Sequence, residues 1–300
     1  MAVRPLTRPA DVGGRLRRTV AILERRGYAV TPERLGELCL GGRVAADDVR
    51  EAVAADRRLA LQDGLVIPPG LRPAVPAILR RAGSHDEHAA RCLPVTLNFV
   101  RALVRICPYV LSVSIAGSLA SGGFLPSDDV DLDLVVEDGH RHLAYVALNL
   151  LGLAHALRHR GKPVDTHTRR PVAPRFMTAN LILERSQCLP LARQDEDMAY
   201  ELMVSRPVYG LATWRRIVST NPGLSDHFPQ LEERRFAEVL RDRPALPGWL
   251  FPSRLDRPAR ALGGAAWRYM QWTRRHRPEA LARVAYVRRT MRPYALFDES

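Results

Sequence analysis

The sequence predicts an α+β protein, in which a mixed β-sheet core with flanking helices follows a small helical domain with a hairpin and precedes a helical C-terminal region. Two patterns carry this prediction. Within residues 110–136, two stretches alternate apolar and polar side chains with a period of two, as strands do. Stretches on either side space their apolar residues three and four positions apart, as helices do. The predicted domains span 1–70, 71–107, 108–205 and 206–300.

The first domain is predicted from three helical stretches and a hairpin. Thr31-Pro32 is a favourable start for the second helix. An Asp-Gly dipeptide at 63–64 separates two short strands, because this dipeptide suits a tight hairpin turn. Three helices and a hairpin are the plan of a winged-helix domain. The third helix, over 49–55, has nearly balanced charges around it, which favours partner docking over DNA binding.

Residues 71–107 form a predicted helical linker with a break or a start at Pro94. His85, His88 and Cys92 share this stretch with a spacing that a metal ion could use. The acidic residues between the two histidines favour a solvated helical turn instead, because no further ligand cluster completes a metal site.

The last domain is predicted to begin with a turn at 206–210 and to continue as helices, one of them over 232–241. The formal net charge of the chain is +13. Residues 241–300 contain thirteen arginines and five acidic residues, so most of the excess positive charge lies there. This excess favours a polyanionic partner such as nucleic acid and a solvated helical face about equally.

Targeting and redox signals point to the cytoplasm. No stretch of eighteen or more apolar residues predicts a transmembrane helix, and the first residues lack the apolar segment of a signal peptide. The cysteines, at positions 39, 92, 107 and 188, are scattered without paired spacing and predict reduced thiols. We therefore expect a cytoplasmic protein without a membrane span.

The chemistry of the chain is concentrated where the first predicted strand of the core ends. Gly117 and Ser118 follow that strand, and a loop of ten residues leads to the next one. Asp129, Asp131 and Asp133 share one face of this second strand. Carboxylates crowded in this way favour a divalent cation between two of them. Gly117 allows close approach of a ligand, and Ser118 offers a hydroxyl and an N–H to phosphate oxygens.

This order of Gly-Ser, spacer and strand-borne Asp-x-Asp resembles the signature of the DNA-polymerase-β-like nucleotidyltransferase superfamily. The spacer length favours the pair Asp129 and Asp131, and the pair Asp131 and Asp133 is the alternative. One ion cannot bind all three, because a strand holds Asp129 and Asp133 about 13 Å apart. The order of a winged-helix-like domain, this core and a helical region is similar to bacterial nucleotidyltransferase-domain proteins. Asn180 on a later strand and the Asn-Pro at 221–222 add to that similarity.

The resemblance implies transfer of a nucleoside monophosphate from a nucleoside triphosphate to an acceptor hydroxyl on a small molecule, a protein or RNA. Gly117 and Ser118 would bind the β- and γ-phosphates. Asp129 and Asp131 would bind Mg²⁺ or Mn²⁺ and serve as the catalytic carboxylates.

The superfamily adds a third carboxylate on a later strand, and its identity stays open here. Asp165 is the favoured candidate for this catalytic metal ligand, and Glu184 is an alternative. Asn180 could instead stand at that position and leave the site without a third carboxylate. The protein would then be a catalytically weak or inactive nucleotide-binding regulator that contacts nucleic acid through its winged-helix-like and basic C-terminal parts.

Overall fold

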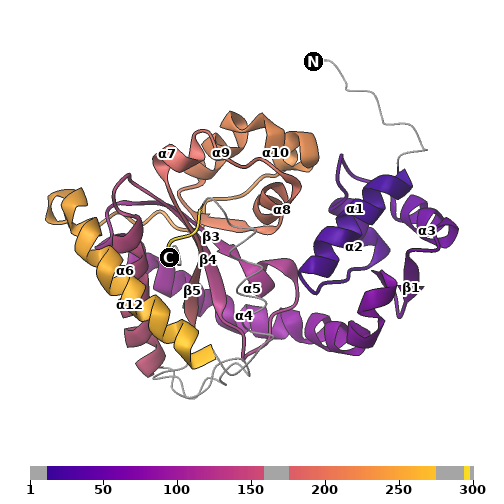
Figure 1. The fold of residues 1–300 in the computed structure, drawn as a ribbon, viewed down its shortest axis with the longest axis horizontal. Helices are drawn as coiled ribbons and strands as arrows, with labels where there is room; N and C mark the ends of the chain where they lie inside the picture. The colour runs from indigo at the N-terminus through magenta and orange to yellow at the C-terminus, as the bar shows by residue number, and fades with distance from the viewer. Residues whose placement is uncertain (1–11, 159–175, 275–293, 298–300) are drawn as a thin grey trace. The chain divides into compact units, whose positions relative to one another are not determined.

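The computed structural model of the protein describes residues 12–158, 176–274 and 294–297 (Figure 1). These residues form a mixed α+β structure with a four-stranded and a two-stranded sheet, which confirms the predicted α+β class. The chain divides into two compact units, each assembled from three separate segments. The first unit comprises Met1–Gly83, Gln194–Met203 and Pro222–Arg234. The second unit comprises Ser84–Arg193, Val204–Asn221 and Arg235–Ser300.

The first unit begins with the three helices and the hairpin that the sequence predicts. They are α1 (Val12–Arg25), α2 (Pro32–Glu37), α3 (Ala46–Ala55), β1 (Ala60–Gln62) and β2 (Leu65–Ile67). The hydroxyl of Thr31 accepts a hydrogen bond from the N–H of Arg34 and caps α2. Asp63 and Gly64 both adopt positive φ angles, 49° and 79°, as a tight turn between two paired strands requires.

Segments from the second half of the chain complete the first unit. They carry α8 (Glu196–Val204), α10 (Pro222–His227) and α11 (Gln230–Glu233). The buried amide of Gln230 donates hydrogen bonds to the carbonyl oxygens of Glu37 and Cys39, at 3.1 and 2.8 Å. The N–H of Gly41 donates to the carbonyl oxygen of His227 at 2.7 Å. The N-terminal helices therefore share one unit with chain that is nearly two hundred positions away in sequence.

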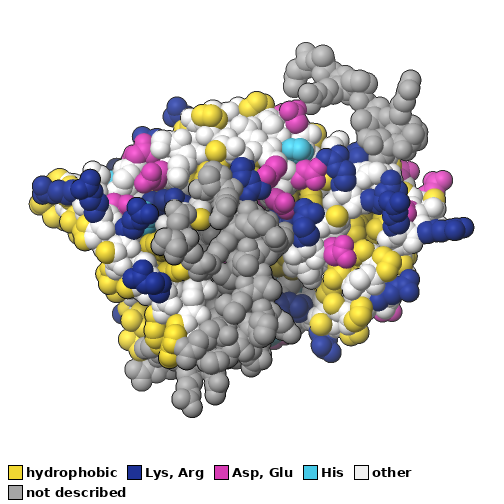
Figure 2. Space-filling view, viewed as in Figure 1, with side chains coloured by type: hydrophobic (Ala, Val, Ile, Leu, Met, Phe, Trp, Pro, Cys, Tyr) yellow, Lys and Arg dark blue, Asp and Glu magenta, His cyan; other side chains and the backbone are white. Residues whose placement is uncertain are grey.

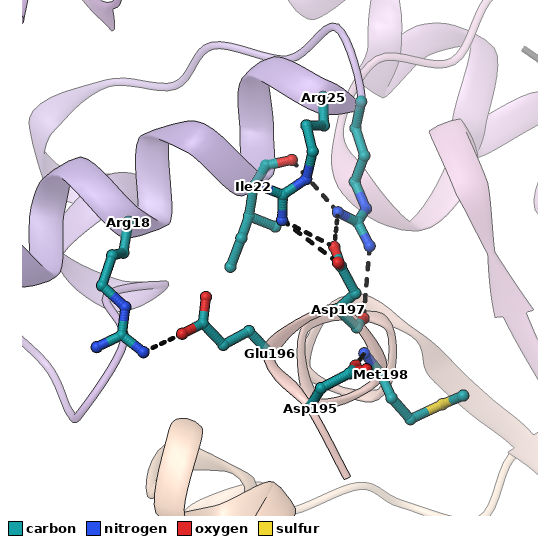
Figure 3. A network of polar contacts seen from close by, with 8 residues as sticks. Arg18, Ile22, Arg25, Asp195, Glu196, Asp197 and Met198 are labelled. Carbon is teal, nitrogen blue, oxygen red and sulfur yellow. Dashed lines mark hydrogen bonds and ion pairs between the residues drawn. The ribbon is translucent and has the colours of Figure 1, made fainter. Parts of the chain in front are cut away.

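Arginine side chains of α1 bind the acidic first turn of α8 (Figure 3). Arg25 and Arg26 donate to the carboxylate of Asp197 at 3.2 and 2.7 Å. Arg18 donates to the carboxylate of Glu196. Burial works to raise the pKa of Asp197, but the hydrogen bonds and positive charges of the arginines outweigh it and hold that pKa below its ordinary value. These hydrogen bonds and ion pairs hold α8 against α1 within the first unit.

The chain passes from the first unit to the second within α4 (Val75–Ile106), which follows the 3₁₀ turn η2 (Pro69–Ala74). The predicted break or start at Pro94 is wrong, because Pro94 lies inside this continuous helix. A proline removes one N–H from the hydrogen bonds of a helix and so destabilises it. Burial of the side chains that follow Pro94 offsets this loss. Phe99, Val100 and Leu103 are fully or almost fully buried in the core under the sheet. None of the described helices, α4 included, is long and apolar enough to cross a membrane.

The second unit contains the four-stranded sheet, with the strand order β5-β4-β3-β6. The strands are β3 (Val110–Ala116), β4 (Val130–Val136), β5 (Met177–Glu184) and β6 (Arg206–Tyr209). β3 runs antiparallel to both β4 and β6, and β4 runs parallel to β5. The turn predicted at 206–210 is wrong over its first four residues, which form the edge strand β6. Pro207 is tolerated there because an edge strand does not need every N–H for the ladder.

Several helices contact the strands of this sheet in the second unit: α5 (Gly117–Ser121), α6 (Arg141–Arg158), α7 (Arg185–Cys188) and α9 (Leu211–Thr220). The second unit also contains α12 (Asp256–Arg274). α6 and α12 lie side by side (Figure 1). The carboxylate of Asp256 accepts hydrogen bonds from the N–H groups of His142 and Leu143, at 2.8 and 2.9 Å, and so caps α6.

The region before α12 is less helical than the sequence predicts. The helix predicted over 232–241 is wrong beyond Glu233, where α11 ends. The chain then continues without an α-helix as far as Leu255, through the short 3₁₀ turns η3 (Gly248–Leu250) and η4 (Ser253–Leu255). Its backbone finds partners elsewhere: the N–H of Leu240 donates to the carbonyl oxygen of Val208 in β6 at 3.0 Å. Contacts with a strand edge therefore replace the local helix.

The four cysteines are buried and are not joined by disulfides, as predicted for reduced thiols. Burial raises the pKa of Cys107 to about 11 and that of Cys188 to about 12. Both therefore remain protonated thiols at neutral pH, with little nucleophilic character.

Candidate functional site

Gly117 directly follows β3 and lies beside the first residues of β4. Ala116 pairs with Asp131 across the ladder, so the residue that follows β3 lies beside this carboxylate. Gly117 has a φ angle of +61°, and a Cβ built on it would lie 2.1 Å from Oδ2 of Asp131. Both the backbone angle and the lack of space therefore require glycine. The Gly-Ser pair, predicted to end the strand at a turn, begins the short helix α5, and Gly117 lies against the predicted Asp-rich strand.

The hydroxyl of Ser118 is bound within the loop that follows it. It donates a hydrogen bond to Oδ2 of Asp128 at 3.0 Å, and the N–H of Leu125 donates to the same oxygen at 3.1 Å. Asp128 thus shapes the loop. Because a hydroxyl carries a single hydrogen, the bond to Asp128 competes with the predicted donation from Ser118 to a phosphate oxygen.

The aspartates of β4 are arranged as the strand period predicts. Asp131 and Asp133 alternate with buried apolar residues and are half-buried on one face of the strand. Asp129, also half-buried, stands directly before the strand. Asp131 is common to both candidate pairs, and its position against Gly117 places it closest to the predicted phosphate-binding turn.

Strand β5 supplies polar partners to two of these carboxylates. The hydroxyl of Thr178 donates to Oδ1 of Asp131 at 2.8 Å. The side-chain amide of Asn180 donates to Oδ1 of Asp133 at 2.8 Å. The role of Thr178 is absent from the sequence prediction, because only the parallel register of β4 and β5 pairs it with Asp131. Its signal in the sequence is a polar residue two positions before Asn180 on a predicted strand.

Of the two candidates for a third carboxylate, the structure describes Glu184. Asp165 lies outside the described residues and stays a prediction. Glu184 pairs with Val136 at the far end of β4, five residues from Asp131, which corresponds to about 16 Å along the strand. Its carboxylate accepts a hydrogen bond from the N–H of Gly139 at 3.0 Å, and Glu184 also forms the capping box of α7. Glu184 is therefore a structural cap too far from Asp131 to share an ion with it.

The histidines of α4 do not form a metal site with Cys92. Nδ1 of His85 accepts a hydrogen bond from the N–H of Phe124 at 3.1 Å. Cys92 is buried, and its sulfur lies 3.7 Å from the hydroxyl of Thr96 on the same helix. Within the part of the chain that the structure describes, no group of three or more His, Cys, Asp and Glu residues is arranged to hold a metal ion.

The donor set beside Gly117 nevertheless suits a hard divalent cation. Mg²⁺ in nucleotide sites is commonly bound by one or two carboxylates together with substrate phosphates and water, so two aspartates are a sufficient protein contribution. Oδ2 of Asp131 faces the space that a Cβ on residue 117 would fill. Carboxylate oxygens also suit Mn²⁺. The oxygen donors of Asp129 and Asp131 are therefore of the kind that such a cation prefers.

Comparison with known proteins finds no match: no protein-family model, no curated protein and no solved structure matches the chain. The function proposed below consequently depends on the residues of the site and on their geometry.

Proposed function

We propose that this protein binds a nucleoside triphosphate together with Mg²⁺ or Mn²⁺ and transfers the nucleoside monophosphate to an acceptor hydroxyl. The observation that carries this proposal is the contact between Gly117 and the carboxylate of Asp131. A phosphate-binding turn and a cation-binding carboxylate have to lie within a few ångströms of each other if one nucleotide is to reach both. This contact supports that requirement.

Each residue of the site has a role in the proposal. Asp129 and Asp131 would hold the cation. When bound, the cation supplies neutralisation of the negative charge on the phosphate oxygens. Gly117 lets the backbone approach the carboxylate of Asp131 closely, and the N–H of Ser118 would donate to a phosphate oxygen. Asp165 remains the proposed third ligand.

The proposal extends to the two units of the chain. The second unit would be a nucleotidyltransferase core, supported by the mixed sheet that carries Asp131 on a central strand. The first unit would be a winged-helix-like domain, supported by the order of three helices and a hairpin. The segments that carry α8, α10 and α11 would be additions to that domain.

A nucleotide-binding protein with weak or no transfer is the second candidate, and one specific observation favours it. Strand β5 places Thr178 and Asn180 against Asp131 and Asp133, where a carboxylate on the neighbouring strand would complete a two-cation site. A hydroxyl and an amide hold a carboxylate in place but do not bind a second cation as strongly as a carboxylate does.

Nucleic acid contact is better supported in the C-terminal region than at α3. Arg50 on α3 is paired with Asp47 at 2.7 Å and also with Glu33, so its charge is locally balanced. Exposed arginines of α12 include Arg257 and Arg260. The face shown in Figure 2 mixes basic with acidic side chains over its described atoms, so a polyanion contact would be a local one.

Two measurements on the full chain test the proposed function. The first is a thermal-shift screen of the four ribonucleoside triphosphates with Mg²⁺ or Mn²⁺, since a ligand that binds only the folded protein raises the melting temperature. The second is the incorporation of α-labelled nucleotide into added RNA, protein and small-molecule acceptors. Cation-dependent stabilisation with labelling supports transfer, and stabilisation without labelling supports the binding protein. No stabilisation by any triphosphate contradicts both.

A further inference from the structure

The loop between the Gly-Ser turn and the Asp-rich strand is attached to α4 through His85. The N–H of Phe124 in this loop donates to Nδ1 of His85 at 3.1 Å. A ring nitrogen that accepts a hydrogen bond carries no proton, so this contact requires a neutral His85 whose proton is on Nε2. The side chain of Phe124 is buried in the same hydrophobic cluster as the α4 residues Phe99 and Val100. The loop therefore meets α4 through a hydrogen bond and through apolar packing.

The same loop is fixed at its two ends by its own residues. Near its start, the N–H groups of Gly122 and Gly123 donate to the carbonyl oxygen of Ser118, at 3.2 and 3.1 Å. Gly122 has a φ angle of +98°, which lets the chain leave α5 sharply. At its end, Asp128 binds the hydroxyl of Ser118. The contact with His85 holds the middle of the loop and comes from outside it.

We propose that His85 is a positioning residue of the nucleotide site, which fixes the loop over residues 122–128 and thereby the placement of Ser118 and Asp129. This inference builds on the proposed function, because it assigns to His85 a role in triphosphate binding. The physical reason is that the loop connects the two residues: Ser118 lies in α5, which leads into the loop, and Asp129 directly follows it, so disorder in the loop reaches both. His85 thereby has a role outside metal binding.

Asparagine is the informative substitution at this position. Oδ1 of asparagine and Nδ1 of histidine are both attached to Cγ, so His85→Asn keeps an acceptor at nearly the same distance from the backbone. His85→Ala removes the acceptor. His88 lies one turn further along α4, so His88→Ala removes a second histidine side chain from the same helix as a matched control.

The first readout is the exchange of the Phe124 amide hydrogen, measured by NMR or by mass spectrometry of a peptide that contains it. We expect faster exchange in His85→Ala, and exchange close to that of the wild type in His85→Asn and His88→Ala. The melting temperature of each variant identifies a general loss of stability. Equal exchange of this amide in His85→Ala and the wild type, with both folded, would overturn the proposal.

The second readout is the dissociation constant for the triphosphate that stabilises the wild type, measured with Mg²⁺. Loss of one hydrogen bond predicts binding that is weaker by about threefold to tenfold in His85→Ala, with recovery in His85→Asn. Tight binding by His85→Ala contradicts the role of His85 while leaving the proposed function intact. If the wild type binds no triphosphate, the proposed function fails, and so does the role of His85 in nucleotide binding.

Discussion

Two groups of acidic side chains in this protein are held in different ways. In the first unit, Asp197 is bound by Arg25, at the end of α1, and by Arg26, which directly follows that helix. In the second unit, Asp131 accepts a hydrogen bond from the hydroxyl of Thr178, and Asp133 accepts one from the amide of Asn180. A guanidinium offsets the charge of a carboxylate. A hydroxyl or an amide orients a carboxylate without offsetting its charge.

The arginine-bound group joins two helices from distant parts of the chain, and its acids occupy a helix N-terminus where negative charge is favourable. In the strand-borne group, Asp131 lies against Gly117. The proposed function assigns cation binding to this second group. We therefore expect substitutions in the first group to change stability and substitutions in the second to change nucleotide transfer.

The largest expected effect is the loss of transfer in Asp131→Asn. Removing a cation-binding charge is expected to lower the rate of labelled-nucleotide incorporation by about 100-fold or more, because charge neutralisation on the phosphates is worth several kcal/mol. Asp129→Asn should behave in the same way. The melting temperature should stay near that of the wild type.

Asp197→Asn is the matched control for this comparison. It removes the same charge from the arginine-bound group and should lower the free energy of unfolding by about 1–3 kcal/mol with little effect on the rate of transfer. Full activity in Asp131→Asn, or loss of activity in a folded Asp197→Asn, would break the distinction between the two groups.

Gly117→Ala should have the next largest effect. The added Cβ would overlap Oδ2 of Asp131 and force a positive φ on alanine, so the turn and the carboxylate have to move apart. We expect the free energy of unfolding to fall by about 1–3 kcal/mol and transfer to fall by about tenfold or more. Denaturant titration and the labelling assay measure the two effects. Gly122→Ala, with no atom within 4 Å of its added Cβ, controls for backbone strain alone. Normal transfer in Gly117→Ala would show that the contact with Asp131 is not needed.

A smaller effect distinguishes the candidates for the third carboxylate. Asp165→Ala should lower the rate of transfer by about tenfold, as expected for a ligand that helps place a cation. Glu184→Ala should leave the rate unchanged and lower stability, because Glu184 caps α7 and binds the N–H of Gly139. Rates measured under identical cation concentrations decide between them. Equal, wild-type-like rates would remove Asp165 from the site.

The smallest expected effect is a loss of stability in acid. Burial works to raise the pKa of Asp256, but hydrogen bonds from His142 and Leu143 hold it below its ordinary value, as the arginines do for Asp197. A carboxylate with a lowered pKa in the folded state stabilises the protein above its unfolded pKa, about 3.9 for aspartate. That stability is lost as the pH falls through the folded pKa. Melting temperatures should therefore drop below about pH 4, and the drop should be smaller in Asp197→Asn.

Local sequence patterns predict several elements and the motif that links two of them. Alternating residues define β3 and β4, and Asn180, predicted to lie on a later strand, lies on β5. Thr31 and the Asp-Gly turn at 63–64 mark the boundaries of their elements because capping and positive φ angles are properties of a few neighbouring residues. The requirement for glycine at position 117 follows from the same local rules and from the proximity of Asp131.

Contacts between distant parts of the chain explain the features that local patterns do not predict. Pro94 remains inside a helix because the turns after it are buried, and residues 206–209 form a strand because β3 offers them an edge. Glu184 is a cap because β4 and β5 are paired in a register that places it far from Asp131. Hydrophobic periodicity relates residues that are a few positions apart. The structures of these segments depend on contacts between residues that are more than forty positions apart. The partners of Asp131 and Asp197 also belong to this second kind, because Thr178 and Arg26 lie far from these acids in the sequence.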